Sequence, residues 1–387
     1  MKVTVRISAG QLNLLSKFYN MKNEIKYGYD DINIVPEISS SIEHRSECKL
    51  EPFLFTAPMS SVVNLDNICD FIEQGIIPII PRNIPLVDRK FFMFSPLQNT
   101  SLFFTALSLE EVEKLLIKFP IEGISYPFYI CIDIANGHMQ KLLNTIKKLK
   151  ELYGEKIVIM SGNIANPETY KLYEEAGCDY VRCGIGGGAG CITASNTGVY
   201  YPLFSLLEET YKVKKSINGK CKIIADGGIR NYCDIQKALL YADYVMLGSM
   251  LNKAIESAGK TTYGKSYFIT KRGKKILNIF RTIFEFGREV PKEKYDSVIK
   301  RIKSGKLEVW KSFYGMSTKK AQSEMGNKKL KTSEGIEFSQ KVEYSLEDFI
   351  DNENSYLRSA MSYTNSKTLD EYKDKKWVSK LNLGHNK

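Results

Sequence analysis

Residues 180–202 read YVRCGIGGGAGCITASNTGVYYP, an apolar run of strand length that leads into a glycine loop around Cys191. Because the run at 180–183 precedes the loop, we expect the loop at the carboxyl end of a strand, where α/β folds place their chemistry. Glycine has no Cβ, so the backbone of such a loop can approach a ligand closely. Cys191 would then be placed to attack a molecule held in the turn.

Two other interpretations of this loop stay open. Gly184, Gly186 and Ala189 match the GxGxxA dinucleotide fingerprint, which requires a helix directly after the glycines. Further glycines and a proline interrupt residues 190–202, so a Rossmann turn is disfavoured. The other interpretation is structural, because a free cysteine such as Cys191 is commonly a small buried hydrophobe.

The composition is that of an ordinary globular chain: 387 residues, 43% hydrophobic and 26% charged. This length allows one large domain or two medium ones. No run of about 18 apolar residues occurs, and the N-terminus (MKVTVRISAG) lacks the apolar core of a signal peptide, so we expect a cytoplasmic protein with no membrane contact. Eight cysteines occur singly with no CxxC pair beside three histidines, which disfavours a disulfide framework or a zinc site.

Positive charge is concentrated near the C-terminus. From residue 260 onward there are 28 Lys+Arg and 16 Asp+Glu, a net +12, whereas the first 259 residues hold 27 and 28, a net −1. Such a surface can attract nucleic acid or an anionic nucleotide. Because lysines outnumber arginines and no nucleic-acid motif occurs, we favour a solvated lysine-rich surface and expect no nucleic-acid partner.

Apolar runs of strand length recur through the first 250 residues, and amphipathic stretches separate most of them. Eight buried strands that alternate with helices predict an α/β fold, a (β/α)₈ TIM barrel. A doubly wound sheet is the alternative, since the number of strands does not decide whether a sheet closes. The expected strands are 53–59, 76–83, 101–107, 128–134, 156–162, 180–185, 221–228 and 244–249.

Polar or glycine-rich motifs end nearly all of the expected strands. Barrel enzymes build their sites from these carboxyl ends, so the register of motifs with strands predicts one site at that edge. The motifs are APMSS at 57–61, PRN at 81–83, DIANG at 133–137, SGN at 161–163, the Cys191 loop, DGG at 226–228 and GS at 248–249.

Three parts are expected along the chain. Residues 1–259 would form the barrel core with an N-terminal extension. Residues 260–312 would form a small basic helical insertion, and residues 313–387 a flap and a C-terminal segment that complete the barrel domain.

Within the insertion, amphipathic patterns predict two helices, at 275–286 and 292–303. Residues 317–335 (STKKAQSEMGNKKLKTSEG) are polar and are typical of a mobile active-site flap rather than of a packed element.

Taken together, these motifs resemble the inosine-5′-monophosphate dehydrogenase/GMP reductase family over roughly residues 27–260 and 313–365. The resemblance implies an oxidoreductase that acts on a purine nucleotide, a TIM barrel, and a homo-oligomer, the family's homotetramer. The motifs that carry it are YDDI at 29–32 with Val35-Pro36, GIGGGAGCIT at 184–193, ADGGIR at 225–230, MLGS at 246–249 and YGMS at 314–317.

The resemblance also assigns roles to individual residues. Cys191 would be the nucleophile that adds to C2 of the purine, and Asp226 would bind the ribose hydroxyls. Carbonyl groups of Gly186, Gly188 and Cys191 would hold a monovalent cation such as K⁺. Other contacts to the nucleotide and its 5′-phosphate would come from Met59, Gly227, Gly228, Gly248, Ser249, Tyr314, Gly315, Met316 and Ser317. The nicotinamide cofactor would lie against Arg82, Asp133, Asn163, Gly184 and Lys331.

Two branches of the family differ in the flap. The dehydrogenase branch activates water with an arginine and a tyrosine, and residues 318–333 contain neither. The reductase branch handles ammonia with a threonine two residues after the cysteine and a flap glutamate, which match Thr193 and Glu334. The expected activity is therefore NADPH-dependent reductive deamination of GMP to IMP. The alternatives are oxidation of IMP to XMP with NAD, and a catalytically silent nucleotide-binding protein.

Overall fold

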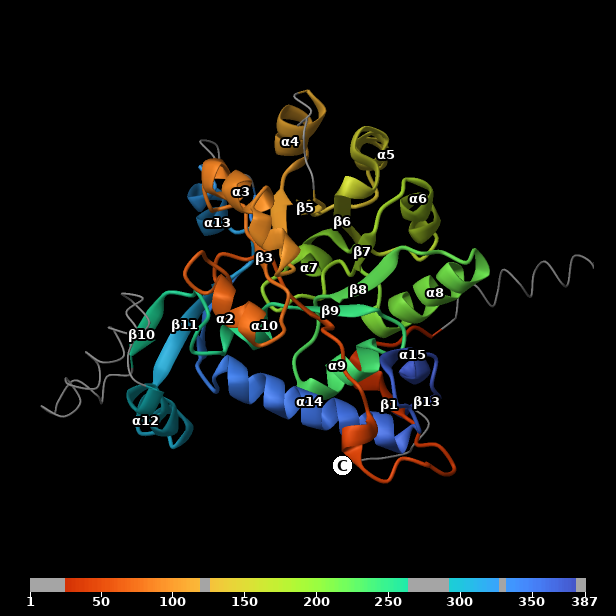
Figure 1. The fold of residues 1–387 in the computed structure, drawn as a ribbon, viewed down its shortest axis with the longest axis vertical. Helices are drawn as coiled ribbons and strands as arrows, with labels where there is room; N and C mark the ends of the chain where they lie inside the picture. The colour runs from red at the N-terminus through yellow and green to blue at the C-terminus, as the bar shows by residue number, and fades with distance from the viewer. Residues whose placement is uncertain (1–24, 119–125, 264–291, 327–331, 381–387) are drawn as a thin grey trace, which may run out of the picture.

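The computed structural model describes residues 25–118, 126–263, 292–326 and 332–380. Eight parallel strands form one sheet in the order β2-β9-β8-β7-β6-β5-β4-β3 (Figure 1). The two ends of this sheet meet, because Ile77, just before β3, pairs in parallel with Phe55 of β2. The expected TIM barrel is confirmed, and the doubly wound alternative is wrong. The strands are β2 Leu54–Thr56, β3 Ile79–Ile80, β4 Phe104–Leu107, β5 Phe128–Asp133, β6 Ile157–Ile164, β7 Tyr180–Cys183, β8 Lys222–Asp226 and β9 Tyr244–Leu247.

All eight expected strands exist, and most are shorter than their apolar runs. The shortest, β3, has two residues and lies between Pro78 and Pro81. Proline has no N–H to donate to a neighbouring strand, so pairing stops there. The SGN motif at 161–163 lies within β6, Asp133 and Asp226 are the last residues of β5 and β8, and the other motifs follow their strands, so all of them lie at or near the carboxyl edge.

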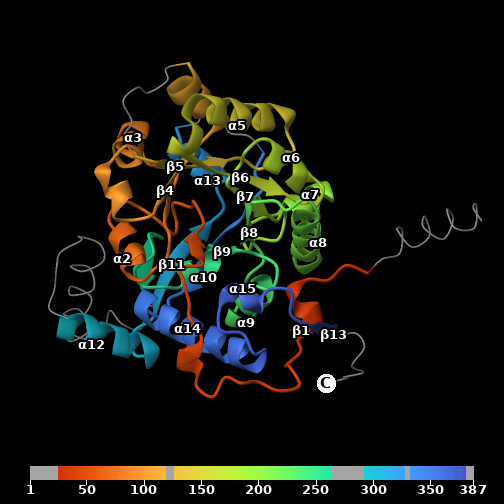
Figure 2. The same ribbon diagram turned by 45° about the vertical axis from the view of Figure 1, so that its right-hand side comes forward.

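Helices surround the barrel, and the views in Figures 1 and 2 show them outside the strands. Their apolar faces explain this placement. In α5 Gln140–Tyr153, for example, Leu142, Ile146 and Leu149 are fully buried against the sheet. The other surrounding helices are α2 Ile68–Glu73, α3 Leu86–Met93, α4 Leu109–Val112, α6 Thr169–Glu175, α8 Leu203–Ser216 and α9 Tyr232–Ala238. No helix in the described part of the chain has both the length and the apolarity needed to cross a bilayer.

Two apolar cores result from this layering. One fills the barrel interior and includes Phe55, Phe104, Met160 and Ile224, all of them fully buried. The larger core lies between the strands and the surrounding helices. Side chains alternate between the two along each strand, as the period of a strand requires.

Two smaller sheets flank the barrel. One pairs β1 Ile32–Ile34 with β13 Trp377–Ser379. The other has the order β10-β11-β12, with β10 Thr261–Tyr263, β11 Val309–Tyr314 and β12 Glu337–Lys341, all antiparallel. The long α14 Leu346–Tyr363 runs beside α9, where Phe349 stacks on Tyr232 (Figure 2).

The expected insertion is described in part. Helix α12 Lys292–Lys303 has the bounds that its pattern predicts, and Val298 and Ile302 pack with Leu307 and Val309 in a separate apolar cluster. The other expected helix, 275–286, lies outside the described residues. Because β10 pairs with β11, the two ends of the segment between them lie side by side.

The segment expected as a flap rather than a packed element is packed in part. Residues 319–324 form α13 Lys319–Glu324, in which Ala321 and Gln322 are buried. The Thr318 hydroxyl oxygen accepts a hydrogen bond from Ala321 N at 3.2 Å and caps the first turn of the helix. An N-terminal cap of this kind favours a helix, so residues 319–324 are helical although their composition is polar.

Candidate active site

A cavity of about 290 Å³ opens at the carboxyl ends of the barrel strands. It is lined by the loops after β2, β3, β5, β6, β7, β8 and β9, together with Phe313, residues 315–317 and Glu334. The expected residues that line it are Met59, Arg82, Asp133, Asn163, Gly184, Gly186, Gly188, Cys191, Thr193, Asp226, Gly227, Gly228, Gly248, Ser249, Gly315, Met316, Ser317 and Glu334.

The cysteine loop follows β7 and begins at Gly184, whose φ of 137° is a backbone conformation that residues with a side chain rarely adopt. A Cβ at this position would lie 2.0 Å from the carbonyl oxygen of Asp226, so the loop can pack against the end of β8 only without a side chain. The helix that follows, α7 Thr193–Thr197, has five residues. A closed barrel with so short a helix does not support the Rossmann interpretation.

Cys191 is partly buried and belongs to a chain of hydrogen bonds. Its thiol donates to Thr193 Oγ1 over 3.2 Å, and the Thr193 hydroxyl donates to Glu334 Oε2 over 2.7 Å. The structure thus brings Glu334 next to Cys191 and Thr193, although it follows Thr193 by 141 positions in the sequence. This contact weakens the interpretation of Cys191 as a simple core residue.

A short backbone bridge holds this arrangement. Ile192 N donates to Glu334 O over 2.8 Å, and Ile336 N donates to Gly190 O over 3.0 Å. These two bonds flank an antiparallel bridge between Cys191 and Gly335. The register of the bridge fixes where the Glu334 carboxylate reaches Thr193.

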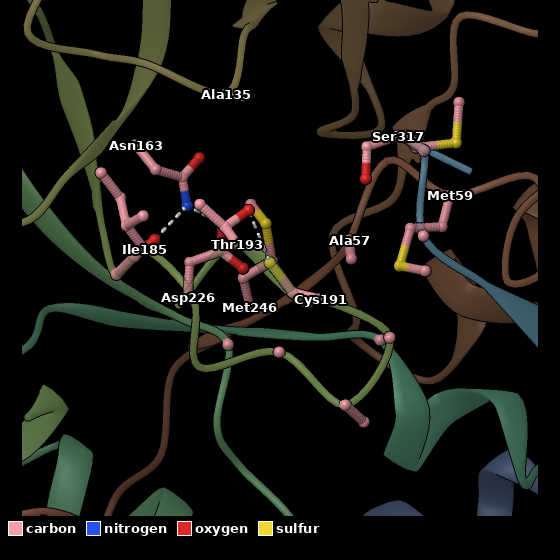
Figure 3. A pocket seen from close by; sticks show the side chains of 18 of the residues that line it. Ala57, Met59, Ala135, Asn163, Ile185, Cys191, Thr193, Asp226, Met246 and Ser317 are labelled. Carbon is pink, nitrogen blue, oxygen red and sulfur yellow. Dashed lines mark hydrogen bonds between the residues drawn. The ribbon is translucent and has the colours of Figure 1, made fainter. Parts of the chain in front are cut away.

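Asp226 ends β8, and its side chain is 13% exposed. Its Oδ2 accepts from Asn163 Nδ2 at 2.6 Å and from Arg182 Nε at 3.0 Å. Oδ1 has no donor among the residues that the structure describes, so it remains available to a ligand hydroxyl. Figure 3 shows Asp226 and Asn163 close to Cys191 and Thr193, with Met59 and Ser317 farther along the cavity.

A second carboxylate, Asp133, lies at the end of β5. Its Oδ1 pairs with Arg182 Nη1 at 2.9 Å and its Oδ2 with Arg82 Nε at 3.0 Å. Burial opposes ionisation of Asp133, but the two arginines outweigh burial and hold its pKa below the ordinary value. Burial likewise opposes the charge on Arg182, while Asp226 and Asp133 raise the pKa of its guanidinium above the usual range. Asp133 and Arg182 therefore stay ionised.

One expected residue, Tyr314, does not line the cavity. Tyr314 is buried behind the cavity, where its hydroxyl bonds to Ser60 at 3.2 Å and to Glu324 Oε1 at 2.8 Å. Burial raises the pKa of Tyr314 to about 12, so its hydroxyl stays protonated. Lys331 lies outside the described residues.

Sequence reasoning missed several residues that line the cavity, among them Met246, Phe313 and Arg182. Met246 opens the MLGS motif but was not assigned to the site, and Phe313 is an ordinary apolar strand residue that nothing in its pattern distinguishes. Arg182 did carry a signal: it is a charged residue inside an apolar strand run, YVRC. A buried charge needs a partner, and this one has two.

Comparison with known proteins agrees with this geometry. Residues 128–283 match the model of the IMP dehydrogenase / GMP reductase domain. A GMP reductase of Oceanobacillus iheyensis is 31% identical over 272 residues, which are 67% of this chain and 79% of that protein. A GMP reductase of Staphylococcus aureus is 32% identical over 259 residues, 62% of this chain and 76% of its own length. One from Buchnera aphidicola is 30% identical over 268 residues, 64% of this chain and 74% of that protein.

Proposed function

This chain belongs to the IMP dehydrogenase/GMP reductase family, and we propose that its activity within the family is reductive deamination of GMP. GMP, NADPH and two protons would give IMP, ammonium and NADP⁺. The single observation that carries this proposal is the hydrogen-bonded chain from the Cys191 thiol through Thr193 to Glu334. The relatives named GMP reductase support the same direction.

The hydrogen-bonded chain offers a route for one proton. As the Cys191 sulfur adds to C2 of the purine, its proton passes to the Thr193 hydroxyl while the Thr193 proton passes to Glu334. The protonated Glu334 then returns a proton through Thr193 to the departing 2-amino nitrogen, and the C2–N bond breaks. NADPH, when bound, supplies the hydride to C2. The C2–S bond then breaks and releases IMP and the cysteine thiolate.

Asp226 would orient the nucleotide. Asn163 and Arg182 saturate its Oδ2 and leave Oδ1 for the ribose hydroxyls. Loop backbones at Gly228, Gly248 and Gly315 supply N–H groups around the far part of the cavity, where a 5′-phosphate would fit.

The dinucleotide would lie against Asp133, Asn163, Gly184 and Arg82, which line the other side of the cavity. Arg82 supplies a positive charge there and is itself paired with Asp133. We keep K⁺ at the carbonyls of Gly186, Gly188 and Cys191 as a prediction, together with NADPH preference and the homotetramer. The Gly188 carbonyl already accepts from Cys191 N at 2.9 Å and would have to share its remaining lone pair.

The dehydrogenase alternative lacks its water-activating pair in this flap, since residues 318–333 hold neither arginine nor tyrosine. A silent binding protein would not need the Cys191–Thr193–Glu334 contact, because nucleotide binding requires none of the three.

The decisive experiment incubates purified protein with GMP and NADPH, and separately with IMP and NAD, while absorbance of the reduced cofactor is followed. We expect the reduced cofactor to disappear in the first mixture and IMP to form. Accumulation of NADH in the second mixture with inert GMP would establish the dehydrogenase instead.

A further inference from the structure

Arg182 occupies the floor of the cavity between the two ligand sides. Its side chain is 8% exposed, and each of its three nitrogens has a carboxylate partner. Nε and Nη2 bond to Asp226 Oδ2 at 3.0 and 2.9 Å, and Nη1 bonds to Asp133 Oδ1 at 2.9 Å. One rigid, planar group therefore fixes both carboxylates.

This sharing makes the two carboxylates mechanically dependent. Asp133 is held on its other oxygen by Arg82, so charges alternate from Arg82 through Asp133 and Arg182 to Asp226. In a buried network each carboxylate depends on its cation, and a shift of one partner misaligns the next. A ligand that immobilises Asp226 would thus reduce the freedom of Asp133, and the reverse also holds.

We propose that Arg182 is a positioning residue that couples binding of the nucleotide to binding of the dinucleotide, an inference that rests on the proposed function. The nucleotide ribose would order Asp226, and Arg182 would pass this order to Asp133 on the dinucleotide side. The second ligand then meets a carboxylate that is already aligned and binds more tightly. Thermodynamic linkage requires that the nucleotide raise the affinity for the dinucleotide by the same factor as the dinucleotide raises the affinity for the nucleotide.

The test measures dissociation constants by calorimetry with GMP and NADP⁺, a pair that cannot transfer hydride. The coupling factor is the Kd of GMP alone divided by its Kd in saturating NADP⁺. We expect a factor of about 5–20 in the wild type, within the usual range for coupled sites. In Arg182→Lys the factor should fall to about 1, because one ammonium cannot make three in-plane bonds to two carboxylates.

A matched control is Arg89→Lys. Arg89 is also a buried arginine, 2% exposed, and bonds to Glu111 and to backbone carbonyls of Ile84 and Ala106 away from the cavity. We expect Arg89→Lys to lower the melting temperature and to leave the coupling factor at its wild-type value. If the coupling factor fell in both Arg182→Lys and Arg89→Lys, general destabilisation of the fold would explain the loss, and the proposal would be overturned.

Asp133→Asn provides a second route, which serves also if Arg182→Lys fails to fold. Because Asp133 lies on the dinucleotide side, a purely local role would leave the affinity for GMP alone unchanged. We expect instead that GMP binds several-fold more weakly. Unchanged GMP affinity in Asp133→Asn, or a wild-type coupling factor in Arg182→Lys, refutes the coupling.

The wild type separates the coupling from the proposed function. If both ligands bind it independently, the coupling alone is wrong. If neither ligand binds, the proposed function is wrong and the coupling is wrong with it.

Discussion

At the scale of single residues, the proposed nucleophile Cys191 has the hydroxyl of Thr193 beside it. Its sulfur lies 3.2 Å from Thr193 Oγ1, in a loop that faces the cavity. Cys191→Ala should lower kcat by about 10³-fold or more and leave the Kd for GMP within a few-fold, since the sulfur acts in the covalent step. Steady-state rates and calorimetry check this. Cys69→Ala, at an exposed cysteine, is the control and should keep full activity. If Cys191→Ala kept more than a tenth of the wild-type rate, Cys191 would not be the nucleophile.

In the proposed reaction Glu334 would act through Thr193, to which it is hydrogen-bonded, and would handle a proton rather than the purine carbon. Glu334→Gln preserves the size of the side chain and its hydrogen bond from Thr193 but cannot take up a proton. We expect kcat for deamination to fall by about 10²–10⁴-fold. A hydride exchange between IMP and NADP⁺ should fall less, because no ammonia leaves. Glu337→Gln, on the nearby strand and paired with Lys320, should be nearly neutral, and equal losses in both reactions would assign Glu334 a structural role.

At the scale of elements, the flap returns to the cysteine loop by a crossing that only glycine permits. A Cβ on Gly335 would lie 2.9 Å from both Gly190 O and Thr318 Cγ2. Gly335→Ala should push the strand away from the loop and separate Glu334 from Thr193. Because displacement by about 1 Å can cost 10²-fold in rate, we expect kcat to fall by about 10–100-fold.

The control for this change is Gly326→Ala in the same flap. Gly326 has φ 76°, and no atom of the residues that the structure describes lies within 4 Å of its would-be Cβ, so it tests backbone strain without the clash. It should retain most of the activity. A comparable loss in both variants, measured as kcat at saturating GMP, would show that flap strain and not the crossing sets the rate.

The same flap shows the limits of local reasoning. Its polar composition predicted no packed element, yet α13 forms because Thr318 caps it and Ala321 and Gln322 bury their side chains. The cap was readable in the sequence, but the surface that buries Ala321 was not. Strand β12 was missed for a similar reason, since its pairing with β11 supplies what its mixed pattern lacks.

At the scale of the molecule, the strands and the edge that carries the site were predictable because both depend on short-range patterns. Closure was not, because it depends on pairing between distant segments such as Leu54 with Val245. Arg182 illustrates the same limit within the site. A charged residue in an apolar strand predicts a partner of opposite charge, but only the arrangement of the neighbouring strands identifies this partner as Asp133 and Asp226.

Stability of the whole molecule should depend on pH through one buried carboxyl. Glu353 in α14 is fully buried: Gln236 Nε2 donates to its Oε1 over 3.0 Å, and its Oε2 has no partner among the described residues. Burial raises its pKa to about 8 from the ordinary 4.5. The folded state therefore keeps a proton that the unfolded chain releases. This contribution is complete below pH 4.5 and is lost as pH rises toward 8.

Glu353→Gln removes this dependence, because a neutral amide of the same shape has no proton to lose. We expect the variant to exceed the wild type by on the order of 2–4 kcal/mol at about pH 9 and to match it within about 1 kcal/mol at pH 5. Urea unfolding at the two pH values measures the difference. Asp351→Asn, exposed on the same helix, should show no such divergence. An equal offset of Glu353→Gln at both pH values would mean that the Glu353 carboxyl ionises normally in the fold, because a packing change would then be the whole effect.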